Sequence, residues 1–314
     1  MRHLIERTRA KDFSHHLAQY QIVMVAASST HGIDRPNQDG RRGVSIEYEL
    51  LSRVDGSARF GFGAPLKHSR ASRLTDGSSS IDDVHAMASV SGPIEVRLVA
   101  ENSTKATFEV TVRPLASIPG TDSKALGAAI KSLLAPSLLL TRHPRTLVQL
   151  VVQPLSPSLV DSPKGIPSLH PGIAAASINA SSLALMNAAV PMKGVVCAVA
   201  VARASSEKLV LNPTGDQLAS STASGCFAFI FTAVESPDNR LHASEVWSNW
   251  QSSLGFDVAE MFAARDLAQQ GARHVWELMK ESVRPSVGVH RPDVEAEVTD
   301  RPPEAGDDGD KMEI

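Results

Sequence analysis

The chain has 314 residues, a hydrophobic content of 42% and a formal net charge of −3, values that are ordinary for a globular protein. No apolar run reaches the roughly 18 residues of a membrane span, and the first residues are charged rather than apolar. These features argue against a membrane protein or a secreted one and favour an intracellular protein. Aromatic residues make up only 4%, so we expect a core of Ala, Val, Leu and Ile, which suits helices packed closely on sheets.

Charge is distributed unevenly along the chain. Residues 285–314 hold nine acidic and three basic residues, a net charge of −6, which leaves +3 for residues 1–284. A mildly basic body can accept a polyanion, but this excess is a weak signal. The acidic tail contains prolines and few large apolar residues, and is therefore expected to be disordered.

The first predicted elements are strands. Residues 1–45 show little periodicity and are interpreted as an irregular N-terminal extension. A hairpin is expected to follow, with Asp55–Gly56 at its turn. Residues 64–82 are rich in serine without an apolar pattern, which indicates a surface insertion or a disordered loop. The predicted strands in this half are Ser45–Ser52, Ser57–Phe62, His85–Ser91, Gly92–Leu98 and Thr107–Arg113.

A helix is predicted over Asp122–Leu140, capped by Asp122 or Ser123, because its apolar positions fall on one face. Those positions are Leu126, Ile130, Leu133 and Leu134. A strand follows over Arg145–Pro154, and three prolines make Ser156–Pro167 a loop. Leu169–Ala189 is rich in Ala, Ser and Leu with almost no charge, so this helix is expected to be buried on most sides.

The last third is predicted to contain three strands and then two amphipathic helices, the second stopped by Pro285. The strands are Gly194–Ala202, Lys208–Leu211 and Cys226–Thr232, and the helices are Ala243–Ser253 and Val258–Ser282. The order of elements predicts an α+β fold, with mixed α/β layers, in one domain over residues 46–284.

Few side chains point to chemistry. Cys197 and Cys226 each lie in an apolar run and are expected to be buried, reduced thiols, since two thiols without nearby histidines make no zinc site. His143 and His170 are expected to be structural. The sequence has no glycine-rich nucleotide loop, no His-Glu-x-x-His and no Gly-x-Ser-x-Gly, so no metal and no cofactor is predicted.

Several short motifs, taken in order over residues 54–232, resemble the RNase PH-like family, and in particular a ring subunit of the eukaryotic RNA exosome. The motifs are Val54-Asp-Gly-Ser-Ala-Arg-Phe60, His85-Ala-Met-Ala-Ser-Val-Ser-Gly-Pro-Ile-Glu-Val-Arg97, Thr111-Val-Arg-Pro114, His143-Pro-Arg-Thr146, Asn187-Ala-Ala-Val-Pro-Met192 and Leu209-Val-Leu-Asn-Pro-Thr214. The resemblance implies an RNase PH-like fold of the ribosomal protein S5 domain 2-like type. Residues 1–45 and 64–82 lie outside it.

The resemblance also implies where a nuclease of this family would hold phosphate and metal. The phosphate loop matches residues 119–127, which offer Lys124 but no arginine. Asp122 would repel phosphate there, at a cost of about 4 kcal/mol at ~4 Å and an effective dielectric constant of about 20. The resemblance implies a second site, the carboxylate turn over residues 210–216, where an active relative carries several acids. This chain has Val210 and Asn212 at two of those positions, and only Asp216 is acidic. We therefore predict no catalytic residues.

The family resemblance instead implies a non-catalytic subunit of a six-membered ring that guides single-stranded RNA toward a nuclease elsewhere in the exosome. Expected partners are other RNase PH-like subunits, cap subunits and that nuclease, with no membrane, in the nucleus, nucleolus and cytoplasm. The candidate RNA-binding residues are Arg113, Lys124 and Lys131. Arg97, Arg142 and Arg145 could equally serve subunit contacts, which are expected at sheet edges and apolar faces.

Two alternatives remain open at this point. The chain could be an active phosphorolytic 3′-exoribonuclease that works as a homo-oligomer. It could also be a small-molecule kinase or a ribosomal protein, which share similar α/β layers; the missing phosphate-binding glycine loop disfavours this class.

Overall fold

The computed structural model describes residues 43–48, 50–63, 83–115, 118–156, 159–160, 168–204, 208–233, 241–253, 255 and 257–283. The chain divides into two units, Met1–Val283 and Arg284–Ile314, and everything described lies in the first. The predicted N-terminal extension up to residue 42, the insertion at 64–82 and the acidic tail lie outside the described residues. None of the described helices is long and apolar enough to cross a membrane.

The first half of the chain forms a five-stranded mixed sheet in the order β1-β2-β3-β5-β4. β4 and β5 are parallel and the other neighbours are antiparallel. α2 makes the crossover between the parallel pair, as such a connection requires. The elements are β1 (Val44–Tyr48), β2 (Gly56–Phe62), β3 (Val84–Glu95), η2 (Leu98–Ala100), β4 (Thr107–Val112), α2 (Thr121–Leu134), η3 (Ala135–Ser137), η4 (Leu140–Arg142) and β5 (Thr146–Pro154).

The second half forms a four-stranded antiparallel sheet in the order β11-β10-β8-β9, flanked by two long helices. A two-stranded pair, β6 with β7, lies between the halves of the sequence. The elements are β6 (Leu159–Val160), β7 (Ser168–Leu169), α3 (Pro171–Asn187), β8 (Val195–Arg203), β9 (Leu209–Leu211), α4 (Gly215–Ala219), β10 (Ala223–Ala233), β11 (Leu241–Ser252) and α5 (Val258–Val283).

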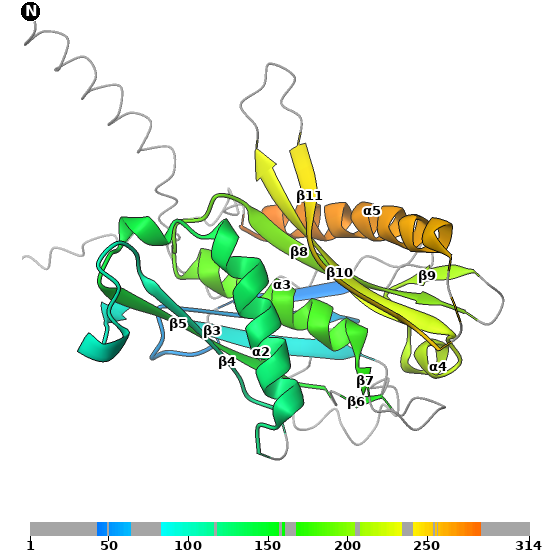
Figure 1. Ribbon diagram of the computed structural model, residues 1–314, viewed down its shortest axis with the longest axis horizontal. Helices are drawn as coiled ribbons and strands as arrows, with labels where there is room; N and C mark the ends of the chain where they lie inside the picture. The colour runs from blue at the N-terminus through cyan, green and yellow to red at the C-terminus, as the bar shows by residue number, and fades with distance from the viewer. Residues whose placement is uncertain are drawn as a thin grey trace, which may run out of the picture. The chain divides into compact units, whose positions relative to one another are not determined.

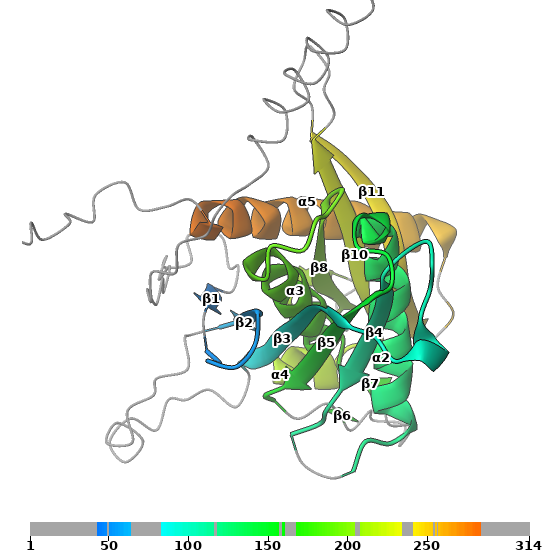
Figure 2. The same ribbon diagram turned by 90° about the vertical axis from the view of Figure 1, so that its left-hand side faces the viewer.

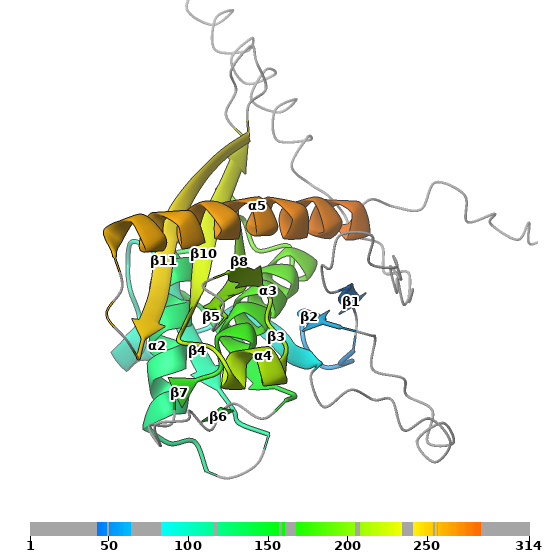
Figure 3. The same cartoon turned by 90° about the vertical axis from the view of Figure 1, so that its right-hand side faces the viewer.

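The layers are the five-stranded sheet, then α2 and α3, then the four-stranded sheet, then α5 (Figure 1). Figure 2 shows α2 lying against β4 and next to α3, and Figure 3 shows α5 running along the far side of β8 and β10. The predicted mixed α/β layers are therefore confirmed.

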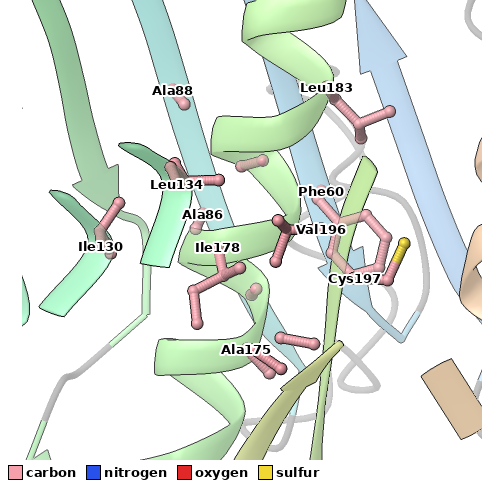
Figure 4. Packing of buried hydrophobic residues seen from close by; sticks show 14 of the residues in the cluster. Phe60, Ala86, Ala88, Ile130, Leu134, Ala175, Ile178, Leu183, Val196 and Cys197 are labelled. Atoms are coloured by element: carbon pink, nitrogen blue, oxygen red, sulfur yellow. The ribbon is translucent and has the colours of Figure 1, made fainter. Parts of the chain in front are cut away.

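α3 lies between the two sheets and is buried from Pro171 to Leu185. Its alanines and serines let both sheets approach, because small side chains shorten the distance between packed layers. Figure 4 shows Ala175, Ile178 and Leu183 of this helix among residues from both sheets, including Phe60 and Val196. The prediction of a helix buried on most sides is confirmed.

The predicted helix over Ala243–Ser253 is wrong, because this segment is the strand β11. It pairs with β10 from Leu241 opposite Ala233 to Ser252 opposite Ala223, with one bulge at Val246. An isolated stretch of Ala, Ser, Glu and Trp has no strong preference, so pairing with a neighbouring strand decided its structure. Val258–Val283 is helical, as predicted.

Other boundaries need smaller corrections. α2 ends at Leu134, since Pro136 cannot continue the helix and the chain turns into η3. α2 begins after Gly120, which makes no side-chain cap, and not at a cap formed by Asp122 or Ser123. β3 is one strand instead of two, with a register shift between Ser91 and Ile94.

The predicted first hairpin exists, but its turn differs. β1 and β2 are antiparallel, with Val44 opposite Phe62 and Tyr48 opposite Ala58. Gly56 begins β2 and is not a turn residue. The Asp55 carboxylate Oδ2 accepts the Gly92 N–H at 2.7 Å, so this acid ties the connection to the irregular part of β3.

Candidate functional site

Lys124 and Lys131 lie on the exposed side of α2. Seven residues are almost two turns of a helix, so both lysines lie on one face, about 10.5 Å apart along the axis. The opposite face of α2 carries the buried residues Leu126, Ile130, Leu133 and Leu134, as predicted. The two lysines therefore form a short basic stripe on a fixed helix.

Arg113 directly follows β4, and its backbone N–H donates to the carbonyl oxygen of Val152 at 2.8 Å. Val112 contacts α2, since a Cβ added at Gly127 would meet its Cγ2 at 3.5 Å. Successive side chains in extended chain alternate between faces. Arg113 is exposed and lies on the face of the sheet away from Lys124 and Lys131, so the structure does not gather the three predicted residues into one patch.

The N-terminus of α2 carries Asp122 in its first turn, where a negative charge is favoured by the helix dipole. Its carboxylate is exposed. It therefore supplies at this helix end the negative charge that a bound anion would otherwise supply.

Asn212 ends β9 in a left-handed conformation, with φ of 49°. Its backbone N–H donates to the Ala200 carbonyl at 2.8 Å, and its Oδ1 accepts the Ala200 N–H at 3.2 Å. Asparagine tolerates positive φ better than most residues and completes the edge of β8 here. Val210, the other position of the carboxylate turn, is half-buried opposite Ala202.

α4 follows this turn and is capped by Thr214. The Thr214 hydroxyl accepts the Gln217 N–H at 3.2 Å, and the Gln217 side chain accepts the Thr214 N–H at 3.0 Å. Asp216 lies in the first turn and is exposed, so it is a turn acid but not the capping residue.

The N-terminus of α3 is a feature that the sequence does not single out as a site. His170 is the N-cap, and its Nδ1 accepts the Gly172 N–H at 3.1 Å. The N–H groups of Ile173 and Ala174 donate to the His170 carbonyl, and Pro171 has no N–H. His170 is thus structural, as predicted, and it occupies the donors that an anion would need. In the sequence, this helix start could have been found from the order His-Pro-Gly before an apolar run, because proline favours the first position of a helix.

Exposed basic residues gather near the C-terminal end of α2, where three loops are joined by backbone hydrogen bonds. These bonds run from Ala106 to Leu140, from Arg145 to Asn102 and from Lys193 to Ser137. Arg145 is 70% exposed and pairs with Glu101 at 3.4 Å, which leaves most of its charge in solvent. The exposed cations on these loops are Arg97, Lys105, Arg142, Arg145 and Lys193. Lys131, in the last turn of α2, leads into this region.

His85 is buried at 2% exposure, and neither ring nitrogen has a hydrogen-bond partner. Burial lowers the pKa of its imidazole; Asp83 raises it and Arg59 lowers it further by charge. Nearby strand β1 holds the Glu47 carboxylate 2.7 Å from the Arg59 guanidinium. The lowered pKa favours the neutral form of this buried imidazole.

The two cysteines are free and buried in β8 and β10, as predicted. Burial raises the pKa of both thiols. Among the described residues, no group of three His, Cys, Asp or Glu side chains is placed to hold a metal ion.

Comparison with known proteins gives three consistent similarities. The model of the 3′ exoribonuclease family, domain 1 (RNase PH), matches residues 40–191. The exosome complex component RRP46 of Saccharomyces cerevisiae is 30% identical over 178 residues, which cover 56% of this chain and 68% of that protein. The exosome complex component rrp46 of Schizosaccharomyces pombe is 32% identical over 150 residues, 48% of this chain and 53% of that protein.

The crystal structure of rice (Oryza sativa) Rrp46 has a similar fold, with a TM-score of 0.59 and 20% sequence identity. The match covers 80% of this chain and 98% of the rice chain. The chain thus spans about half of the fission-yeast relative and almost all of the rice structure.

Proposed function

Because the chain belongs to the RNase PH-like 3′ exoribonuclease family, we propose that it is a ring-building and RNA-guiding subunit of an exosome that does not itself cut RNA. Two relatives carry the name exosome complex component RRP46, and the motifs of this chain resemble the subunit of that kind, ribosomal RNA-processing protein 46. The proposed partners are other RNase PH-like subunits, cap subunits and the nuclease of the assembly. The proposed locations are the nucleus, nucleolus and cytoplasm.

The proposal that this chain does not cut RNA rests on the side chains of the turn between β9 and α4. Metal-assisted cleavage needs carboxylates that hold a cation or move a proton. Here Val210 is aliphatic, and the amide of Asn212 already accepts the Ala200 N–H. Asp216 alone remains, and one carboxylate cannot bind the metal and also move the proton.

The charges and hydrogen bonds at the N-termini of α2 and α3 support the same proposal. A phosphorolytic enzyme uses inorganic phosphate as the nucleophile, which needs cationic side chains or free N–H groups at a helix N-terminus. Asp122 brings negative charge to the start of α2, and His170 uses the first donors of α3. The RNA that reaches this subunit would therefore pass it without reaction.

Incubation of the purified chain with end-labelled single-stranded RNA, phosphate and Mg²⁺ tests this proposal. We expect no nucleoside diphosphate from the wild-type protein. Asn212→Asp keeps the acceptor for the Ala200 N–H and restores one acid, but it should stay inactive because Val210 remains. Release of nucleoside diphosphates that Asp216→Asn abolishes would identify the chain as an active nuclease.

RNA guidance is proposed to use the basic stripe of Lys124 and Lys131, with Arg113 on the other face of the sheet as a separate contact. Phosphate contacts of this kind need exposed cations at fixed positions and no base recognition. The rigid helix supplies the fixed positions, and the buried opposite face keeps the lysines toward solvent.

A further inference from the structure

The η2 turn between β3 and β4 presents aliphatic side chains to solvent. Leu98 is 86% exposed and Val99 is fully exposed, and no residue of η2 is buried. Figure 1 shows this turn, in cyan, at the left-hand end of the first sheet. Two adjacent aliphatic side chains at nearly complete exposure form a small apolar surface that a partner could cover.

Hydrogen bonds hold this turn in place. The Ala100 N–H donates to the Arg97 carbonyl at 2.8 Å, and the Thr107 hydroxyl donates to the Ala100 carbonyl at 2.7 Å. The Asn102 Oδ1 accepts both the N–H and the hydroxyl of Thr104, at 3.0 and 2.9 Å. Because the backbone is already ordered, covering Leu98 and Val99 would cost little conformational entropy.

Exposed cations lie on the same loops as this turn and on the two loops bonded to them. We call them the basic loop surface, which consists of Arg97, Lys105, Arg142, Arg145 and Lys193. Arg97 directly precedes η2. The acids beside them are Glu95, which is exposed, and Glu101, which pairs with Arg145 at 3.4 Å. Positive charge is therefore in excess, which fits an anionic partner.

Arg145 has a backbone conformation that favours glycine, with φ of 61°. Its N–H donates to the Asn102 carbonyl at 3.0 Å, which helps to hold it there. Residues other than glycine pay a cost in this region, and such residues gather at functional sites. The side chain of Arg145 is 70% exposed, so a contact with a partner would explain why a charged residue occupies this position.

We infer that the basic loop surface and η2 together bind an acidic segment of a partner protein, one whose carboxylates are interspersed with aliphatic side chains. The carboxylates would pair with the cations, and the aliphatic side chains would cover Leu98 and Val99. Binding of this segment requires neither a ring nor RNA, so it is independent of the proposed function.

Single-stranded nucleic acid fits this surface less well than such a segment. Its phosphates could pair with the cations, but its bases stack on aromatic side chains. Among the described residues of these loops, none of the exposed side chains is Phe, Tyr or Trp. Leu98 and Val99 offer branched aliphatic surface instead, which suits the side chains of a polypeptide.

Fluorescence anisotropy of labelled probes with the purified full chain tests this assignment. One synthetic peptide repeats Asp-Glu-Leu, a second repeats Asp-Glu-Ser, and a single-stranded RNA oligonucleotide has the same net charge. We expect the Asp-Glu-Leu peptide to bind at least about tenfold more tightly than the Asp-Glu-Ser peptide, because only leucine can cover the apolar turn. Equal binding of the two peptides overturns the inference, as does an RNA that binds more tightly than the Asp-Glu-Leu peptide and displaces it.

Replacement of the apolar pair locates the binding site. Leu98→Ser with Val99→Ser should lower the affinity for the Asp-Glu-Leu peptide by about tenfold or more and leave the Asp-Glu-Ser peptide unaffected. Both side chains are exposed, so the melting temperature should not change. Unchanged affinity for the Asp-Glu-Leu peptide would place its binding elsewhere and overturn the inference.

Charge reversal tests the cations. Arg142→Glu with Lys193→Glu should weaken the binding of both peptides by about tenfold or more. The matched control, Lys208→Glu with Arg273→Glu, makes the same change of charge at exposed positions elsewhere and should bind both peptides like the wild type. Equal losses in the two double variants would show an effect of net charge alone and overturn the inference.

Arg145→Gly separates binding from stability. Glycine relieves the strain at positive φ but gives the unfolded chain more freedom, so the melting temperature should stay close to the wild-type value. Loss of one cation should lower the affinity for the Asp-Glu-Leu peptide by about threefold or more. A variant that melts at a lower temperature and binds the peptide unchanged would overturn the role assigned to Arg145.

Discussion

At the residue scale, a few polar side chains complete the backbone of β8. β9 pairs with β8 only from Val201 to Arg203. Beyond it, Asn179 of α3 donates to the Ala198 carbonyl at 2.8 Å and accepts the Ala198 N–H at 2.7 Å. Asn212 serves Ala200 with its side-chain Oδ1, which accepts the Ala200 N–H, and with its own backbone N–H, which donates to the Ala200 carbonyl. Unpaired backbone groups in a core cost about 1–3 kcal/mol each, so these amides are structural.

His85 gives a prediction at this scale because its imidazole is buried without a hydrogen-bond partner. Its folded pKa is lowered from 6.5, so the unfolded chain binds a proton first as the pH falls. Stability should therefore decrease as the pH falls below about 6.5. Urea unfolding between about pH 8 and pH 5 should show a weaker pH dependence for His85→Gln than for the wild type.

His242→Gln, at an exposed position of β11, is the matched control and should keep the wild-type dependence. An equal slope in His85→Gln and the wild type would show that the buried imidazole does not set the acid sensitivity.

At the element scale, the first sheet is tied to the last helix. The Tyr48 hydroxyl of β1 and the Ser282 hydroxyl of α5 are 2.8 Å apart. Burial raises the pKa of Tyr48 to about 12, and this hydrogen bond partly offsets the increase. Met279, one turn earlier on α5, contacts Cys197 of β8 at 3.6 Å between the sulfur atoms. α5 thus joins the edge of the first sheet to the centre of the second.

Removal of this link gives a prediction for the elements. Tyr48→Phe and Ser282→Ala should each lower the free energy of unfolding by about 1 kcal/mol, the usual net value of one hydrogen bond. The double variant should lose clearly less than the sum of the two, because both changes remove the same bond. Urea unfolding of the four proteins measures this coupling, and strict additivity would show that the hydroxyls do not interact.

At the scale of the whole molecule, α3 lies between the two sheets with α2 beside it, and α5 lies on the far side of the four-stranded sheet. The basic stripe of α2 and the edge of β11 belong to different layers as well. The proposed RNA contact at α2 would therefore use a surface separate from the edge of the four-stranded sheet.

This separation leads to a prediction about RNA. In the assembled ring, Lys124→Ala with Lys131→Ala should weaken binding of single-stranded RNA and lower the slope of log affinity against log salt by about 1.4, as two phosphate contacts on a single strand imply. The double variant Arg273→Ala with Lys280→Ala removes equal charge from α5 and should bind like the wild type. Equal losses in both double variants would point to net charge alone. Filter binding at several salt concentrations measures the slopes.

Local patterns were sufficient for most elements of the fold. The 3.6-residue spacing of Leu126, Ile130 and Leu133 predicted the buried face of α2, and the uncharged Ala-rich segment predicted the central helix α3. The β11 segment could not be predicted in this way. Its Ala, Ser and Glu suit a helix as well as a strand, and pairing with β10 decided between them.

The sequence by itself determined the family and the buried cysteines, and it places neutral side chains at Val210 and Asn212, where the resemblance implies acids, because these depend on residue identity in short motifs. Only the tertiary structure decided that Arg113 lies on the opposite face from the α2 lysines, that cations on three distant loops share one surface, and that β11 is the outermost of the described strands in its sheet. The physical reason is that these properties depend on hydrogen bonds and packing between segments far apart in the chain, and no local pattern encodes them.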